Sequence, residues 1–171
     1  LDDYWKLPPG HLNYDHYELS GKRIENNIAE ADMVTVTTET LAEKVRPFNS
    51  NVHVFPNGLP YGHNQFIEDK RESDRIRIFW CGGVTHEEDL KMLRGPVSKL
   101  KMYADKIQMV IGGYTDTDET SKAIWMRMFS SFTLGGQLPY MKLHGTGPIN
   151  YMQMYEHADI MVIPLEDSEW H

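Results

Sequence analysis

The sequence predicts an α/β fold built on parallel sheets. Two observations point to it. Short runs rich in β-branched and aromatic residues alternate with segments of helical periodicity, and several of these runs are followed directly by glycine. Strands that alternate with helices along a chain are typical of α/β units, in which the strands lie parallel. No run is apolar for the roughly 18 to 20 residues that a membrane span requires, so we expect no such span.

Two helices and two strands are predicted in the upstream part of the chain. Ile24 and Ile28 recur at i and i+4 on one helical face. Thr38 has the side chain of an N-cap, and Pro47 ends the helix that follows it. In chain order, the predicted elements are a helix, a strand, a helix and a strand, over Gly21 to Ala31, Met33 to Thr37, Thr38 to Val45, and Asn51 to Phe55.

Four further strands and three helices are predicted downstream. The strands are Arg75 to Trp80, Ile107 to Ile111, Met141 to His144, and Asp159 to Ile163. The helices are Glu87 to Tyr103, Asp118 to Phe132, and a short one capped by Asn150 that runs through Tyr155. The Gly95-Pro96 pair is expected to disturb the first of these helices, because proline removes a backbone donor.

A linker is predicted between the two groups of elements. The stretch after Phe55 is rich in Pro, Gly and Asn, which are typical of turns, and every residue from Glu68 to Glu72 is charged. We therefore expect a first domain over residues 1–60, a linker over 61–74 and a second domain over 75–171.

The charge of the chain limits its partners. Lys and Arg number 17 against 25 Asp and Glu, and the net charge of −8 argues against binding to a nucleic acid backbone.

The only cysteine, Cys81, has no second thiol in the chain, which favours a reducing compartment. We expect a cytoplasmic location, and a peripheral association of the whole protein with a membrane stays open.

Glycines follow three of the downstream strands. They are Gly82-Gly83, Gly112-Gly113 and Gly145. In an open parallel sheet, ligands bind beyond the carboxyl ends of the strands, where glycine lets them approach the backbone. The N–H groups of the next helix would suit a diphosphate. The alternative is that these glycines only form tight turns. The pattern is neither Gly-x-Gly-x-x-Gly nor a P-loop.

The histidines suggest one ligand contact and no zinc site. His86 precedes the first downstream helix, where its imidazole could bind a phosphate or a sugar hydroxyl, or merely cap the helix. Glu87 to Asp89 are interpreted as first-turn acids that offset the helix dipole. His11 and His16 lie five apart, but no cysteine or His-Glu-x-x-His motif joins them, so no metal ligand is assigned.

Three parts of the sequence together resemble a known family. They are Ala31 to Ala42 with Val52 to Gly58; Ile78 to Gly83 with His86 and Asp89-Leu90; and His144-Gly145 with Tyr151, Tyr155 and Ala158 to Leu165. In order and spacing, these stretches resemble the GT-B fold glycosyltransferases of the "group 1" type, which act on nucleotide-sugars. The resemblance implies two Rossmann-like halves, both incomplete here, with parallel sheets.

The resemblance also implies a function. The parent protein would transfer a sugar from a nucleotide-sugar to a hydroxyl of a saccharide or lipid-linked acceptor, with retention and without an obligatory metal or other cofactor. The implied diphosphate contacts are Gly82, Gly83 and His86. Residues near the nucleobase would be Gly145, Thr146 and Ile149. Asn57 and Gly58 would lie at the interdomain cleft, and no catalytic residue is assigned.

Several expectations follow for the chain as it stands. The donor-binding Lys and Glu of the family would follow Leu165, and the chain stops at His171, so we expect little transferase activity from these 171 residues alone. An uncovered strand edge would favour a homodimer over a monomer. Two other functions stay open: a non-catalytic nucleotide- or sugar-binding module, and a sugar-nucleotide epimerase of the same fold.

Overall fold

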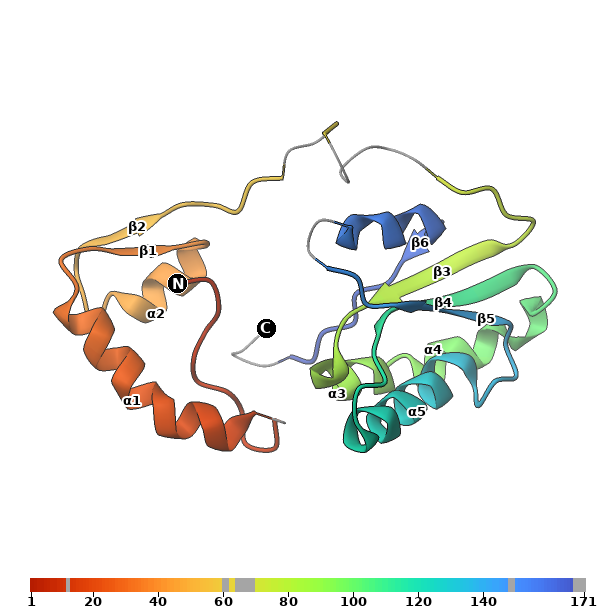
Figure 1. Ribbon diagram of the computed structural model, residues 1–171, viewed down its shortest axis with the longest axis horizontal. Coiled ribbons are helices and arrows are strands. Elements are labelled where there is room, and N and C mark those ends of the chain that lie inside the picture. Colours follow the sequence, from red (N-terminus) through yellow and green to blue (C-terminus); the bar gives the residue numbers. More distant parts are fainter. Residues whose placement is uncertain (12, 60–61, 64–69, 148–149, 168–171) are drawn as a thin grey trace. The chain divides into compact units, whose positions relative to one another are not determined.

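The computed structural model describes the chain except for residues 12, 60–61, 64–69, 148–149 and 168–171. It contains two compact units, which we call the first unit, containing Leu1–Leu59, and the second unit, Pro60–Glu166. Each unit carries a sheet whose paired strands all run parallel (Figure 1). The α/β class with parallel sheets that the sequence predicts is therefore confirmed.

The first unit packs two helices with a two-stranded sheet. Its elements are α1 (Tyr14–Glu30), β1 (Val34–Val36), α2 (Glu39–Val45) and β2 (Val52–Val54). Thr38 caps α2 as predicted, because its hydroxyl accepts a hydrogen bond from the Leu41 N–H at 3.1 Å. The core of this unit is formed by Trp5, Ile28, Val34, Val36, Leu41, Ala42 and Val45.

Helix α1 begins a full two turns before the predicted start. Its first half is largely polar, so hydrophobic periodicity gives no signal there. Inside the helix, the Tyr14 hydroxyl donates to Glu18 at 3.3 Å, an i,i+4 contact of the kind that supports an exposed helix.

The second unit alternates strands with short helices. In chain order they are β3 (Ile76–Cys81), η2 (Val84–His86), α3 (Glu87–Lys91), α4 (Arg94–Lys99), η3 (Leu100–Tyr103), β4 (Ile107–Tyr114), α5 (Glu119–Thr133), β5 (Tyr140–His144), η4 (Tyr151–His157) and β6 (Ile160–Met161). The described strands lie in the order β5-β4-β3-β6, with β3 and β4 at the centre.

Helices cover both faces of this sheet, which explains why its central strands are apolar throughout (Figure 1). Trp80 and Met109 point to the face covered by α3, α4 and α5. Phe79 and Val110 point to the opposite face, where they pack with Met154 of η4. All four side chains are 3% exposed or less.

Three predicted elements of the second unit differ most from the structure in extent. The helix expected from Glu87 to Tyr103 is interrupted after Lys91, and Pro96 lies in the first turn of α4, where its missing N–H costs no hydrogen bond. Strand β4 continues through its two glycines to Tyr114, so the prediction that Gly112-Gly113 end this strand is wrong. Strand β6 covers only Ile160–Met161. Across the described residues, no helix is both long and apolar enough to span a bilayer.

Candidate functional site

Three strand ends meet backbone to backbone at the carboxyl edge of the second unit's sheet. We call the contact between Gly82, Gly113 and Gly145 the glycine edge. A Cβ placed on Gly113 would lie 2.4 Å from the Gly82 carbonyl oxygen, and one on Gly145 would lie 3.4 Å from the Gly113 oxygen. Gly113 also has φ +88, which favours glycine. The register of β4 against β5 shifts here, as in a β-bulge, which explains why the strand passes through its glycines.

Gly82 and Gly83 differ in what the fold demands of them. A Cβ on Gly82 would lie 2.7 Å from the Trp80 indole, so packing requires glycine there. Gly83 has an ordinary φ of −102, and a Cβ placed on it would have the Thr85 hydroxyl oxygen as its nearest neighbour, at 3.9 Å. The fold therefore explains Gly82 but leaves open space beside Gly83, through which a ligand could approach the backbone.

The helix after Gly83 is shorter than the sequence predicts. A 3-10 turn, η2, comes first, and α3 has five residues, with Glu87, Glu88 and Asp89 in its first turn. A short helix with an acidic first turn offers little positive potential to an anion. Any favourable contact with a phosphate at this edge must then come from the backbone at Gly83 and from His86.

His86 is held in place by a buried carboxylate. Its Nδ1 lies 2.8 Å from Oδ2 of Asp89, whose side chain is 3% exposed. The other oxygen, Asp89 Oδ1, accepts the Glu166 N–H at 2.7 Å. Asp89 thus does more than offset the helix dipole. It ties the His86 ring to the chain that follows β6.

The neighbouring acid, Glu87, is held differently. It pairs with Arg127 of α5, with hydrogen bonds of 2.7 and 2.8 Å, and the Arg127 guanidinium lowers the pKa of Glu87. The pair is a link between α3 and α5 rather than a free charge at the edge.

A neutral polar pair beside the end of β3 was not found from the sequence. Cys81 Sγ lies 3.2 Å from the Tyr151 hydroxyl. Burial raises the pKa of both groups, so both are uncharged at neutral pH. Tyr151 and Tyr155 are in ring contact at 6.2 Å, and Tyr155 also packs against Phe79, at 5.1 Å between ring centroids. Seventy positions separate Cys81 from Tyr151, so no local pattern signals their contact.

The other predicted site residues are distributed as follows. Gly145 belongs to the glycine edge, and Thr146 follows it, exposed. Ile149 lies outside the described residues. Asn57 and Gly58 belong to the first unit, where the Asn57 amide donates to Asp2 at 3.1 Å. Within the described part of the chain, no group of three or more His, Cys, Asp or Glu side chains is arranged to hold a metal ion.

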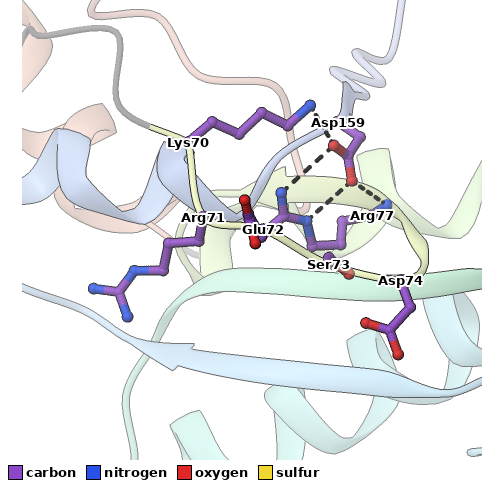
Figure 2. Close-up of a pocket in the computed structure, with 7 residues that line it drawn as sticks. All are labelled: Lys70, Arg71, Glu72, Ser73, Asp74, Arg77 and Asp159. Atoms are coloured by element: carbon purple, nitrogen blue, oxygen red, sulfur yellow. Dashed lines mark hydrogen bonds and ion pairs between the residues drawn. The ribbon is translucent and has the colours of Figure 1, made fainter.

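A hollow of about 580 Å³ lies at the opposite, amino-terminal edge of the same sheet (Figure 2). The basic side chains that line it are all paired. Arg77 Nε lies 3.0 Å from Asp159 Oδ2, Lys70 also pairs with Asp159, and Arg71 Nε lies 2.9 Å from Glu156. The Arg77 side chain is 3% exposed. This network fastens β6 to β3, and we interpret it as structural.

Neither the models of known protein families nor the curated proteins match the chain. The function must therefore be argued from the residues of the glycine edge and their surroundings.

Proposed function

We propose that the chain is part of a glycosyltransferase that moves a sugar from a nucleotide-sugar to a hydroxyl of a saccharide or lipid-linked acceptor. In this proposal the second unit binds the nucleotide-sugar at its glycine edge. The observation that carries the proposal is the open space beside Gly83, because packing does not demand a glycine there. The resemblance of the surrounding residues to the "group 1" glycosyltransferases supports it.

The leaving diphosphate needs stabilisation as negative charge develops on it. Gly83 would supply a backbone that a phosphate oxygen can approach closely, and the His86 ring would lie beside that phosphate. The bond from His86 Nδ1 to Asp89 supports this role, since a fixed ring is already oriented for a ligand when it arrives.

The nucleobase would lie toward Gly145 and Thr146. The Cys81–Tyr151 pair supports an uncharged group nearby, because both side chains stay neutral and can exchange hydrogen bonds with a ribose hydroxyl or a base edge. In this proposal the uncharged base and ribose lie beside the neutral Cys81–Tyr151 pair, and the charged diphosphate lies beside Gly83.

A binding module without catalysis is the second candidate. It is favoured by the pairing of the ionisable side chains described around the edge: His86 pairs with Asp89, and Glu87 pairs with Arg127. No general acid or base is assigned among them. Product analysis separates the candidates: a transferase releases a nucleoside diphosphate and a glycosylated acceptor, an epimerase returns an altered nucleotide-sugar, and a binding module returns its ligand unchanged.

We expect Gly83→Val to weaken the binding of UDP or GDP by about tenfold or more, roughly 1.4 kcal/mol of binding free energy. The added methyl groups would occupy the open space and keep phosphate oxygens from the backbone, without a clash in the free protein. Isothermal titration calorimetry with both nucleotides measures the change.

Gly95→Val is the matched control for this titration. Gly95 also has open space around it, but it lies in α4 and not at the glycine edge. Equal affinities in the wild type, Gly83→Val and Gly95→Val would place the nucleotide elsewhere on the protein.

A further inference from the structure

The segment that leaves β2 contains an Asn-Gly dipeptide, Asn57-Gly58, which occurs nowhere else in the sequence. Both residues are exposed, and they lie in a stretch without helix or strand. The amide carbon of an asparagine side chain can be attacked by the backbone nitrogen of the next residue. A following glycine favours this attack, because it has no Cβ to obstruct the approach. The dipeptide is therefore a candidate for covalent modification.

The backbone nitrogen of Gly58 is accessible and unoccupied. As far as the described residues extend, its N–H donates no hydrogen bond to another backbone group. A Cβ placed on Gly58 would meet no heavy atom within 4 Å, so the space around the residue is open. No ladder of a helix or strand protects this peptide group. The fold thus leaves the attacking atom exposed.

The side chain of Asn57 is held lightly. Among the described residues, its amide has one hydrogen-bond partner: Nδ2 donates to Asp2 Oδ1 at 3.1 Å, and this contact is exposed to solvent. One exposed hydrogen bond contributes little to stability and is readily exchanged for water. The amide can therefore turn toward the Gly58 nitrogen at small cost.

Asn49, in the same unit, has the opposite arrangement. Its Nδ2 donates to the carbonyls of Ile28 and Ala31, at 2.8 and 2.7 Å, and its Oδ1 accepts the Asn51 N–H at 2.8 Å. Rotation of this amide toward the nitrogen of Ser50 would break all of these bonds. Asn49 is also followed by a small residue, so it provides an internal comparison in which the fold restrains the side chain.

We propose that Asn57 is a site of spontaneous deamidation. The Gly58 nitrogen attacks Asn57 Cγ, and this new bond closes a cyclic succinimide. The bond from Cγ to Nδ2 breaks, and ammonia leaves with the proton that the Gly58 nitrogen gives up. Water then opens the ring at either of its carbonyl carbons, which yields aspartate or isoaspartate. The net reaction exchanges water for ammonia and needs no oxidant or reductant, and it does not depend on nucleotide binding at the glycine edge.

The modification replaces an attraction by a repulsion. The Asn57 amide donates to the Asp2 carboxylate, whereas a carboxylate at position 57 has no proton to donate at neutral pH. Asp2 belongs to the segment before α1, which brings Trp5 into the core of the first unit. Deamidation therefore loosens this segment, and isoaspartate also adds one carbon to the main chain after β2.

Peptide mass spectrometry of the whole chain, incubated at mildly alkaline pH, measures the conversion of each amide to a carboxyl group. We expect Asn57 to react at least about tenfold faster than Asn49 in the folded chain. In guanidinium chloride Asn49 should speed up far more than Asn57, since only Asn49 is restrained by the fold. Gly58→Ala should slow the reaction at Asn57 by about tenfold or more, without a clash in the fold. Gly95→Ala is the matched control and should react like the wild type.

Solvent exchange of the Trp5 indole N–H, followed by NMR, tests the loosening. The signal is assigned by its loss in Trp5→Phe. We expect exchange about fivefold or more faster in Asn57→Asp than in Asn57→Ala, which loses the hydrogen bond but adds no charge. The proposal is overturned if folding slows Asn57 as much as Asn49, if Gly58→Ala reacts like Gly95→Ala, or if Asn57→Asp and Asn57→Ala exchange equally fast.

Discussion

Gly113→Val should destabilise the second unit by roughly 3 to 5 kcal/mol, among the larger effects of single substitutions. Two costs combine at this residue. A β-branched side chain is strained at φ +88, and its Cβ would lie 2.4 Å from the Gly82 carbonyl oxygen. Since that oxygen is backbone, it cannot move aside without separating the ends of β3 and β4.

Urea denaturation followed by tryptophan fluorescence measures this loss, because Trp80 and Trp125 are both buried in the second unit. Gly83→Val is the matched control, as it makes the same change at a neighbouring strand end with an ordinary φ and open space. Its midpoint should stay near that of the wild type. Equal midpoints for the two variants would contradict the packing described at the glycine edge.

Asp159→Asn should cost about 2 to 4 kcal/mol, because it leaves the buried Arg77 guanidinium without its counter-charge. Figure 2 shows Asp159 between Lys70 and Arg77. Besides the ion pairs, Asp159 Oδ2 accepts the Arg77 backbone N–H at 2.7 Å, and the Asp159 N–H donates to the Arg77 carbonyl at 3.0 Å. The pair therefore fixes the start of β6 against β3.

The double variant Arg77→Met/Asp159→Asn provides the control for this effect. Removing both charges should recover most of the stability, since replacing a whole buried pair is far less costly than breaking it. Urea midpoints of the two single variants and the double variant form a complete cycle. If the double variant were as unstable as the sum of the single variants, the ion pair would not be the cause.

The same pair makes the stability depend on pH. The Arg77 guanidinium holds the pKa of Asp159 well below its ordinary value. The unfolded chain therefore binds this proton at a higher pH than the folded one. The contribution is complete above about pH 5 and is lost as the pH falls below the unfolded value of about 4. Asp159→Asn should show a weaker loss of stability over that range when melting temperatures are compared.

Much of the fold follows from local patterns in the sequence. The alternation of strands and helices predicts the parallel sheets, and Thr38 predicts the start of α2 through its capping hydroxyl. The start of α1 was missed because a polar helix half carries no periodic signal. The path of β4 through Gly112 and Gly113 was missed because a bulge depends on the neighbouring strand.

The candidate site was predicted only in part, because some of its contacts join residues that lie far apart in the sequence. Glycines after strands indicate an edge that a ligand can approach, and Gly82, Gly83 and Gly145 do lie after strands at the carboxyl edge of the sheet. The role of Asp89 depends on Glu166, which lies 77 positions away, and that of Cys81 depends on Tyr151. Contacts over such separations have no local signature, so only the folded structure reveals them.

The central claim, that the glycine edge binds the nucleotide part of a sugar donor, is tested most directly by mapping backbone amides. Amide NMR spectra of the whole chain, recorded during titration with UDP and with GDP, report on Gly82, Gly83, Gly113 and Gly145 separately. We predict saturable shifts at Gly83 and at least one of the other three with one of the nucleotides. Unchanged glycine signals with both nucleotides, or saturable shifts only around Arg77 and Asp159 at the opposite edge, would contradict the claim.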